Sequence, residues 1–258
     1  MTLTDCVLKL AAPLPRIEDS DRFLFIGPHP DDIEIGAGAT AAKLAAAGKT
    51  VAFLICMDGR YGLEHAPQGT EPAELIEIRR KEALASARML GVEDVSFLNL
   101  SDGGFYEREE LLRGIAREIG RFRPDCLFAP DPSVDSECHV DHRRCGEIAR
   151  QLAFFAPFRE IMERYGAEPA PVRVLAFYMT ARPNRYVRTA ETSALQLRSI
   201  FDCHRSQFPE GCAEGRSIRL YLKLRALDFG LRCGCRRAEG FRVLGRTQMH
   251  CLPEAGKP

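Results

Sequence analysis

The chain has 258 residues, which is enough for one domain or two small ones, since domains usually run to about 100–200 residues. Apolar residues make up 45% and charged residues 28%, and this balance excludes extended disorder. Lysine plus arginine equals aspartate plus glutamate at 36 each, so we expect no nucleic-acid partner. No apolar run reaches the about 18 residues of a membrane helix, and no secretory signal precedes the domain, so we expect a cytoplasmic protein without a membrane span.

The first part of the chain alternates short apolar runs with longer amphipathic stretches. Residues 1–20 carry two prolines and few periodic apolar residues, and we expect them to form an arm along the surface. Apolar runs predict strands at 22–27, 50–56, 94–98, 125–129 and 173–178. The stretches between them predict helices near 33–47, 72–90, 107–122 and 141–156. Such alternation is typical of βαβ units, and almost continuously apolar strands indicate a sheet covered on both faces.

The pattern weakens after residue 178. Residues 182–188 include Pro183 and Asn184 and predict a loop, whereas 190–205 and 217–230 predict helices and 241–244 a last strand. We therefore expect an α/β fold, with a Rossmann-like, mostly parallel sheet, helices on both faces and a C-terminal cap region. Residues 21–258 would form one domain, with the cap beginning near residue 180.

Polar side chains with metal-binding chemistry gather after the first and fourth predicted strands. The first strand is followed by Gly27-Pro-His-Pro-Asp-Asp-Ile-Glu34, and the fourth by an acidic loop at 130–135 and then His139, Asp141 and His142. Ligands of open parallel sheets bind beyond the carboxyl ends of the strands. Two imidazoles and one carboxylate form a ligand set that zinc uses in hydrolytic sites, with a position left open for water.

Each of these side chains also has an ordinary structural interpretation. An aspartate before a helix is commonly an N-cap, which applies to both Asp31 and Asp32. A single histidine near a helix start is commonly a surface residue. The combination of two acids and three histidines at two strand ends of one sheet nevertheless favours metal binding, and Pro30 would fix His29 relative to Asp32.

These motifs resemble those of a known family. The pattern His29-Pro30-Asp31-Asp32-x-Glu34, followed by His139-x-Asp141-His142, resembles the PIG-L (LmbE-like) zinc-dependent de-N-acetylases. The resemblance covers roughly residues 20–210, and it continues through Met57-Asp58-Gly59, Arg79-x-x-Glu82, Leu100-Ser101-Asp102 and His204-Arg205-Ser206-Gln207.

The resemblance implies a site and a reaction. Zn²⁺ would be held by His29, Asp32 and His142, although the same ligands accept Fe²⁺. Asp31 would be the general base for the attacking water, as positioned carboxylates are in hydrolases. His139 would stabilise the oxyanion and Asp141 would orient an imidazole. The partner would be a small N-acylated amino sugar or its conjugate, which loses an acetyl or other short acyl group.

Two further residues are predicted to bind substrate. Arg79 would hydrogen-bond sugar hydroxyls or a phosphate, or alternatively form an i,i+3 pair with Glu82. Asp102 would bind a sugar hydroxyl, or alternatively form a turn with Gly103. Asp58 lies at the same edge of the sheet and is equally compatible with a turn before Gly59.

Three alternatives remain at the level of the sequence. Two histidines and a carboxylate also form the site of iron(II) oxygenases, although those ligands usually lie on a β-sandwich. A non-catalytic sugar-binding relative is the second alternative, although Asp31 is intact. A dinucleotide-binding module is the third, but Gly36 to Ala39 fall inside the predicted helix, where small residues would let it pack close to the sheet. Homo-oligomer formation is left open.

Overall fold

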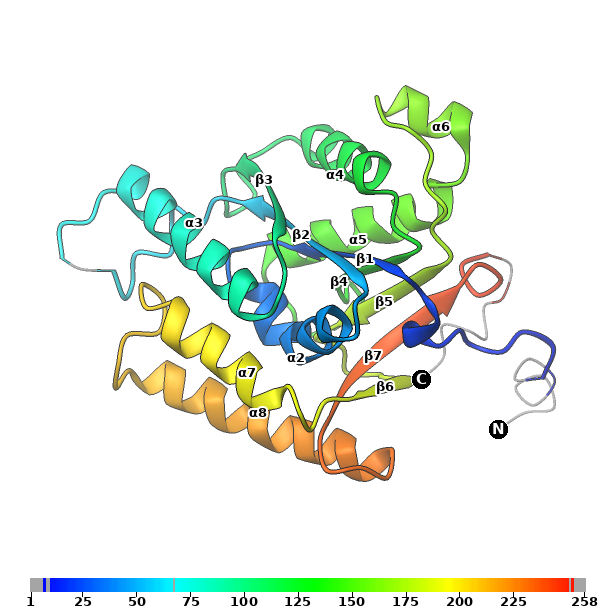
Figure 1. Cartoon of the computed structure of the whole chain (residues 1–258). Helices are drawn as coiled ribbons and strands as arrows, with labels where there is room; N and C mark the ends of the chain where they lie inside the picture. Colours follow the sequence, from blue (N-terminus) through cyan, green and yellow to red (C-terminus); the bar gives the residue numbers. More distant parts are fainter. Residues whose placement is uncertain (1–6, 8–9, 67, 251, 253–258) are drawn as a thin grey trace.

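A single seven-stranded sheet forms the centre of the molecule in the computed structural model, which describes residues 7, 10–66, 68–250 and 252 (Figure 1). The strand order is β3-β2-β1-β4-β5-β7-β6. Five strands are parallel: β1 Arg22–Gly27, β2 Thr50–Met57, β3 Asp94–Leu100, β4 Cys126–Pro130 and β5 Val174–Tyr178. Two antiparallel strands, β7 Ala238–Gly245 and β6 Arg185–Arg188, complete one edge.

Helices cover both faces of this sheet. Successive strand residues point to opposite faces, so Phe23 and Phe25 of β1 join one core cluster while Leu24 and Ile26 join the other. The first cluster includes α2 Asp32–Ala46 and α3 Pro72–Met89, and the second includes α4 Arg108–Phe122 and α5 Val140–Phe155. The predicted α/β fold with a mostly parallel, doubly covered sheet is therefore confirmed.

The C-terminal region packs outside α2. It contains α7 Ser193–Arg198, a π-helical turn η2 Ser199–Cys203 and α8 Ala213–Arg232, whereas the short helix α6 Arg159–Arg164 packs on the other face of the sheet, with α4 and α5. The loop prediction for 182–188 is wrong at residues 185–188, because this stretch forms β6 by pairing with β7. Its partner lies about fifty residues further along the chain, as the pair Arg185 and Phe241 shows, and such long-range pairing leaves no local pattern. Helix α6 was also not predicted.

The predicted N-terminal arm lies partly outside the described residues, which exclude 1–6 and 8–9. Its last residues form a short 3₁₀ helix, η1 Ile17–Asp19, and Arg185 of β6 donates to the backbone carbonyl of Pro15. The division into an arm and one domain remains a prediction. None of the helices in the described part of the chain combines the length and apolarity that crossing a bilayer requires.

Small residues bring α2 close to the sheet, as expected. A Cβ atom at Gly36 would lie 2.2 Å from the ring of Tyr178, so only glycine fits there. The hydroxyl of Tyr178 donates to the carbonyl of Ile26 at 2.8 Å, which fixes the ring against β1.

The C-terminal region also holds α2 by polar contacts. The Glu239 carboxylate of β7 accepts hydrogen bonds from the backbone N–H groups of Ala39 (3.2 Å) and Thr40 (2.7 Å) in the middle of α2. The Gln196 amide of α7 donates to the carbonyl of Glu34 at 2.9 Å and to Glu239 at 2.8 Å. These bonds fix the position of α2 along its own axis, and its first turn carries Asp32.

A buried ion pair ties the end of β4 to β7. Asp131 accepts from Arg242 Nε at 2.8 Å and Nη2 at 2.5 Å, and from the Thr180 hydroxyl at 2.6 Å. Burial opposes the charged form, but these hydrogen bonds lower the pKa of the Asp131 carboxyl. Asp131, in the acidic loop 130–135, is thus a structural residue.

We expect Asp131→Asn to lower the free energy of unfolding by about 3–5 kcal/mol at neutral pH, because it leaves Arg242 without its charge partner. A carboxyl whose pKa is lower in the folded state stabilises the protein above its unfolded pKa, and loses this effect as the pH falls through the folded pKa. The difference from the parent should therefore shrink below pH about 3.9. Urea denaturation measures it. The exposed Asp19→Asn is the control, and a pH-independent difference would contradict the ion-pair explanation.

Candidate metal centre

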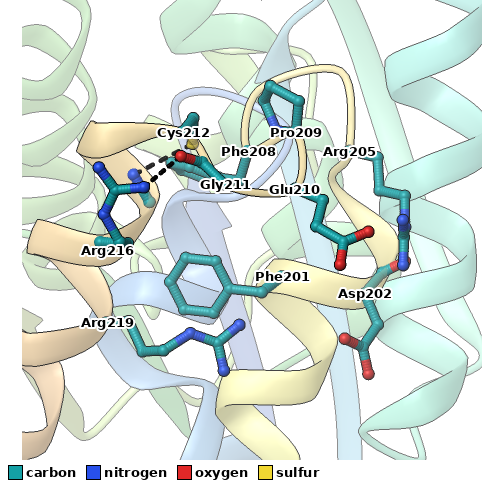
Figure 2. Close-up of a pocket in the computed structure, with 11 residues that line it drawn as sticks. Phe201, Asp202, Arg205, Phe208, Pro209, Glu210, Gly211, Cys212, Arg216 and Arg219 are labelled. Atoms are coloured by element: carbon teal, nitrogen blue, oxygen red, sulfur yellow. Dashed lines mark hydrogen bonds between the residues drawn. The ribbon is translucent and has the colours of Figure 1, made fainter.

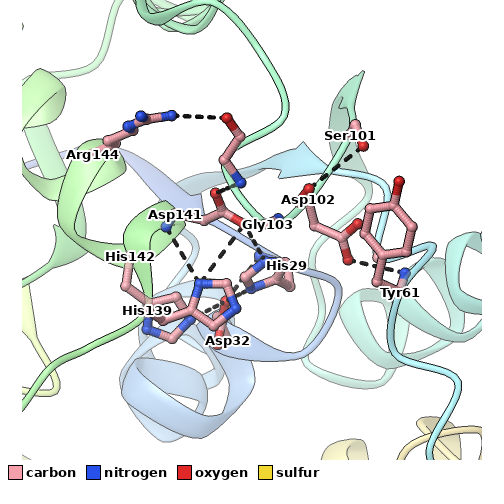
Figure 3. A network of polar contacts seen from close by, with 12 residues as sticks. His29, Asp32, Tyr61, Ser101, Asp102, Gly103, His139, Asp141, His142 and Arg144 are labelled. Atoms are coloured by element: carbon pink, nitrogen blue, oxygen red, sulfur yellow. Dashed lines mark hydrogen bonds and ion pairs between the residues drawn. The ribbon is translucent and has the colours of Figure 1, made fainter.

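The loops that follow β1 and β4 meet because these two strands are neighbours in the sheet. The β1 loop carries His29 and leads into α2 at Asp32. The β4 loop leads into α5, whose first turn contains His142. Figure 3 shows the three side chains pointing toward one another at the carboxyl edge of the sheet.

His29, Asp32 and His142 form a compact cluster whose potential ligand atoms lie within 4.8 Å of one another. Asp32 Oδ2 lies 3.1 Å from His29 Nδ1 and 3.3 Å from His142 Nε2, and it accepts the backbone N–H of His29 at 2.8 Å. The ordinary structural interpretations of these residues are therefore wrong. Asp32 is buried and its carboxylate accepts from His29 instead of capping α2, and the imidazoles of His29 and His142 point inward instead of toward solvent.

The other nitrogen of each imidazole faces a carboxylate. His29 Nε2 lies 3.1 Å from Asp141 Oδ2, and His142 Nδ1 lies 3.0 Å from Glu137 Oε2. A carboxylate that accepts the N–H of a neutral imidazole leaves the opposite nitrogen with a free lone pair, as in many metal-bound histidines. Glu137 was missed in the sequence. Its position five residues before His142 in an acidic loop gave no distinct signal.

The electrostatics of the cluster fit a bound cation. Burial lowers the pKa of His29, but hydrogen bonds with Asp141 and Asp32 outweigh it and raise the value to about 10. Burial likewise lowers the pKa of His142, while Asp32 raises it to about 9. The carboxylates thus favour positive charge between them, and a divalent ion with two neutral imidazoles would satisfy the same requirement.

Asp31 lies next to this cluster in an unusual backbone conformation. Its φ of 141° and ψ of −23° are rare for a residue with a side chain, and such strain is often found at functional sites. The side chain forms no capping hydrogen bond, so the N-cap interpretation of Asp31 is wrong. Burial raises the pKa of Asp31 to about 6, against the opposing effect of Arg79.

Arg79 of α3 contacts Asp31 and does not pair with Glu82. Its Nη2 lies 3.2 Å from Asp31 Oδ2, and its other hydrogen bonds go to the carbonyls of Pro30 and Gly59, both at 3.1 Å. Glu82 instead accepts from the backbone N–H and hydroxyl of Ser206. The predicted i,i+3 pair is therefore absent, and the predicted contact of Arg79 with substrate stays a prediction.

His139 and Asp141 occupy different environments. Asp141 is fully buried and accepts from the backbone N–H groups of Gly103 (2.8 Å) and Gly104 (2.9 Å), in addition to its contact with His29. His139 is the accessible imidazole, with 45% of its side chain exposed, and its ring centroid lies 4.9 Å from that of His142. Burial and the neighbouring imidazoles lower the pKa of His139.

The loops after β2 and β3 supply the remaining predicted residues. Asp102 is 6% exposed, its Oδ2 accepts the backbone N–H of Tyr61 at 3.3 Å, and its Oδ1 is an unpaired buried atom among the described residues. Asp58 is held in an ion pair with Arg60. Asp102 thus presents an unused acceptor beside the cluster, whereas Asp58 has a structural partner.

Glu34 of the first motif lies in the first turn of α2 and forms buried polar contacts with two neighbouring elements. Its Oε1 accepts the Ser86 hydroxyl at 2.6 Å and lies 3.3 Å from Nε2 of His204, which is fully buried. Burial lowers the pKa of His204, but the Glu34 carboxylate raises it overall. These contacts join the start of α2 to α3 and to the C-terminal region.

A separate cavity of about 220 Å³ lies between η2 and the start of α8 (Figure 2). It is lined by Arg205, Arg216, Arg219, Asp202 and Glu210 around the ring of Phe201. Arg219 lies over this ring at 4.1 Å from its centroid. No residue of the His/Asp cluster lines the cavity, so it is distinct from the candidate metal centre.

The fold and the cluster define a Rossmann-like α/β protein with a potential metal centre at the carboxyl edge of its sheet. The sequence model of the PIG-L family, described as GlcNAc-PI de-N-acetylase, matches residues 24–153. The diacetylchitobiose deacetylase of Thermococcus kodakarensis is 32% identical over 92% of this chain and 88% of its own length. The chain therefore belongs to the PIG-L family, as the sequence motifs predicted.

Two further proteins are similar to this chain. The structure of N,N'-diacetylchitobiose deacetylase from Pyrococcus horikoshii, complexed with its inhibitor MPG, matches with a TM-score of 0.86 and 32% identity, over 98% of this chain and 97% of that one. The 1D-myo-inositol 2-acetamido-2-deoxy-alpha-D-glucopyranoside deacetylase of Kineococcus radiotolerans is 29% identical over 69% of this chain and 57% of its own length.

We expect Asp141→Asn to lower the free energy of unfolding by about 1–3 kcal/mol in the absence of metal. An asparagine offers one acceptor oxygen, so it leaves the N–H group of Gly103 or Gly104 unpaired. Urea denaturation in the presence of a chelator measures the loss. Asp135→Asn, which changes an exposed aspartate of the preceding loop, is the matched control. Equal stabilities of Asp141→Asn and the parent would show that the carboxylate does not organise these loops.

Proposed function

We propose that this chain is a metal-dependent hydrolase that removes the acetyl group from an N-acetylglucosamine unit of an oligosaccharide or glycoside. The observation that carries the proposal is the inward-facing cluster of His29, Asp32 and His142, with each imidazole oriented by a carboxylate. The names of the relatives support the reaction, because those described above are all deacetylases of acetamido sugars.

Zn²⁺ is the proposed metal, and Fe²⁺ is the second candidate because the same donors accept it. When bound, the metal would lower the pKa of a water molecule and polarise a carbonyl oxygen. His29 Nδ1, Asp32 Oδ2 and His142 Nε2 would hold it, since these atoms already face one another.

The remaining residues carry the proton transfers. Asp31 accepts a proton from the attacking water, and the ion pair with Arg79 positions its carboxylate. The oxygen of water adds to the acetamide carbonyl carbon, and His139 donates a hydrogen bond to the resulting oxyanion. The C–N bond then breaks, and the nitrogen takes a proton from Asp31 or His139. Acetate and the free amino sugar are the products, and the water is consumed.

We expect Asp31→Asn to keep its metal and to lower kcat by about 10²–10⁴-fold, the usual contribution of a general base. His142→Ala should purify with little metal because it lacks one ligand. Metal content is measured by elemental analysis, and activity by amine release from N,N'-diacetylchitobiose. Asp135→Asn is the matched control. Full activity of Asp31→Asn would show that another group takes the proton.

The same assay separates the alternative enzyme class. An iron(II) oxygenase would consume oxygen when supplied with a 2-oxo acid and would release no amine from an acetamido sugar. We expect amine and acetate in equal amounts and no oxygen uptake. Oxygen consumption without deacetylation would contradict the proposed hydrolysis.

A further inference from the structure

Two exposed aromatic side chains stand at the rim of the candidate site. Tyr61 is 54% and Phe105 is 73% exposed, and their ring centroids lie 5.9 Å apart at an interplanar angle of 74°. We call these two residues the aromatic pair. The two rings contact each other in solvent, although large apolar side chains are more stable when they are buried in the core. Adjacent exposed apolar side chains of this kind are typical of binding surfaces.

The aromatic pair is joined to the metal centre by one short loop. Tyr61 follows β2 and Phe105 follows β3, and Gly103 lies beneath both rings: a Cβ there would be 3.2 Å from Phe105 and 3.9 Å from Tyr61. The N–H of Gly103 donates to Asp141, which contacts His29. Figure 3 shows Tyr61 beside Asp102, which lies between Tyr61 and the histidines.

A buried acceptor lies next to the apolar rings. Asp102 is more than nine-tenths buried, and its Oδ1 has no hydrogen-bond partner in the described part of the chain. A buried carboxylate oxygen without a donor is unfavourable, so a ligand hydroxyl there would be stabilised. The site therefore combines apolar faces with one unused acceptor, which is the usual composition of a pocket for a small polar organic ligand.

A pyranose ring matches the composition of this site, because it presents C–H groups on its face and hydroxyls at its edge. The arginine that precedes Tyr61 in the chain, Arg60, is already in an ion pair with Asp58, so it is not free to bind a phosphate.

We infer that the aromatic pair is a subsite for the second sugar ring of the substrate, the ring attached to the N-acetylglucosamine unit that is deacetylated. This inference rests on the proposed function for the identity of the first ring. The second ring lies against Tyr61 and Phe105, while a hydroxyl donates to Asp102. The aromatic pair thereby selects an oligosaccharide over a monosaccharide.

Calorimetric binding tests the subsite without turnover, in the Asp31→Asn background. N,N'-diacetylchitobiose should bind about tenfold more tightly than N-acetylglucosamine, since one aromatic contact contributes about that factor. Tyr61→Ala and Phe105→Ala should each remove most of this preference. Tyr61→Phe and Phe105→Tyr should retain it, because the rings remain. Tyr221→Ala is the matched control, since Tyr221 is 53% exposed on α8 and distant in sequence from the site.

Three results would overturn the subsite: equal binding of the two sugars, equal weakening of both by the alanine variants, or a change of molecular mass in light scattering with Tyr61→Ala. The last would show that the aromatic pair is an interface between copies of the chain. Tight, ring-dependent binding of the disaccharide by a parent protein that releases no acetate would instead contradict the proposed function and leave the subsite standing.

Discussion

The candidate site contains two carboxylates that the fold removes from water, and their negative charge must be balanced by hydrogen-bond donors. Asp141 is fully buried and Asp32 is 5% exposed, and an uncompensated charge in either place costs several kcal/mol. The two imidazoles and the backbone N–H groups of the neighbouring loops meet this requirement. Because these donors and acids come from the loops after β1, β3 and β4, their hydrogen bonds fix the three loops relative to one another.

The strand order places the residues of the candidate site in one row along an edge of the sheet. In the order β3-β2-β1-β4, four loops leave the same edge of the sheet side by side. They present, in turn, Asp102, Tyr61, the pair His29 and Asp32, and finally His142. The proposed sugar contacts at one end of this row and the potential metal ligands at the other therefore follow from strand adjacency, although the residues are spread over more than a hundred positions.

Much of this arrangement was predictable from the sequence. The parallel strands were visible because a strand covered on both faces is apolar at every position, and the metal-type cluster because His29 and Asp32 lie within one turn. The contacts that were missed join elements distant in sequence. Arg79 meets Asp31 only because α3 packs beside the start of α2, and β6 exists only because β7 returns beside β5. Glu137 orients His142, but an acid within an acidic loop carries no distinguishing spacing.

The hydrogen bonds from Glu239 and Gln196 to the interior of α2 show that the candidate site depends on residues outside the segment that matches the family model. The segment that matches the family model, residues 24–153, contains every proposed metal ligand and the proposed base. Yet the helix that carries Asp32 is anchored by residues from α7 and β7, outside that segment. A truncated chain would lose the groups that set the position of this helix, so the C-terminal region is part of the scaffold that holds the candidate metal site.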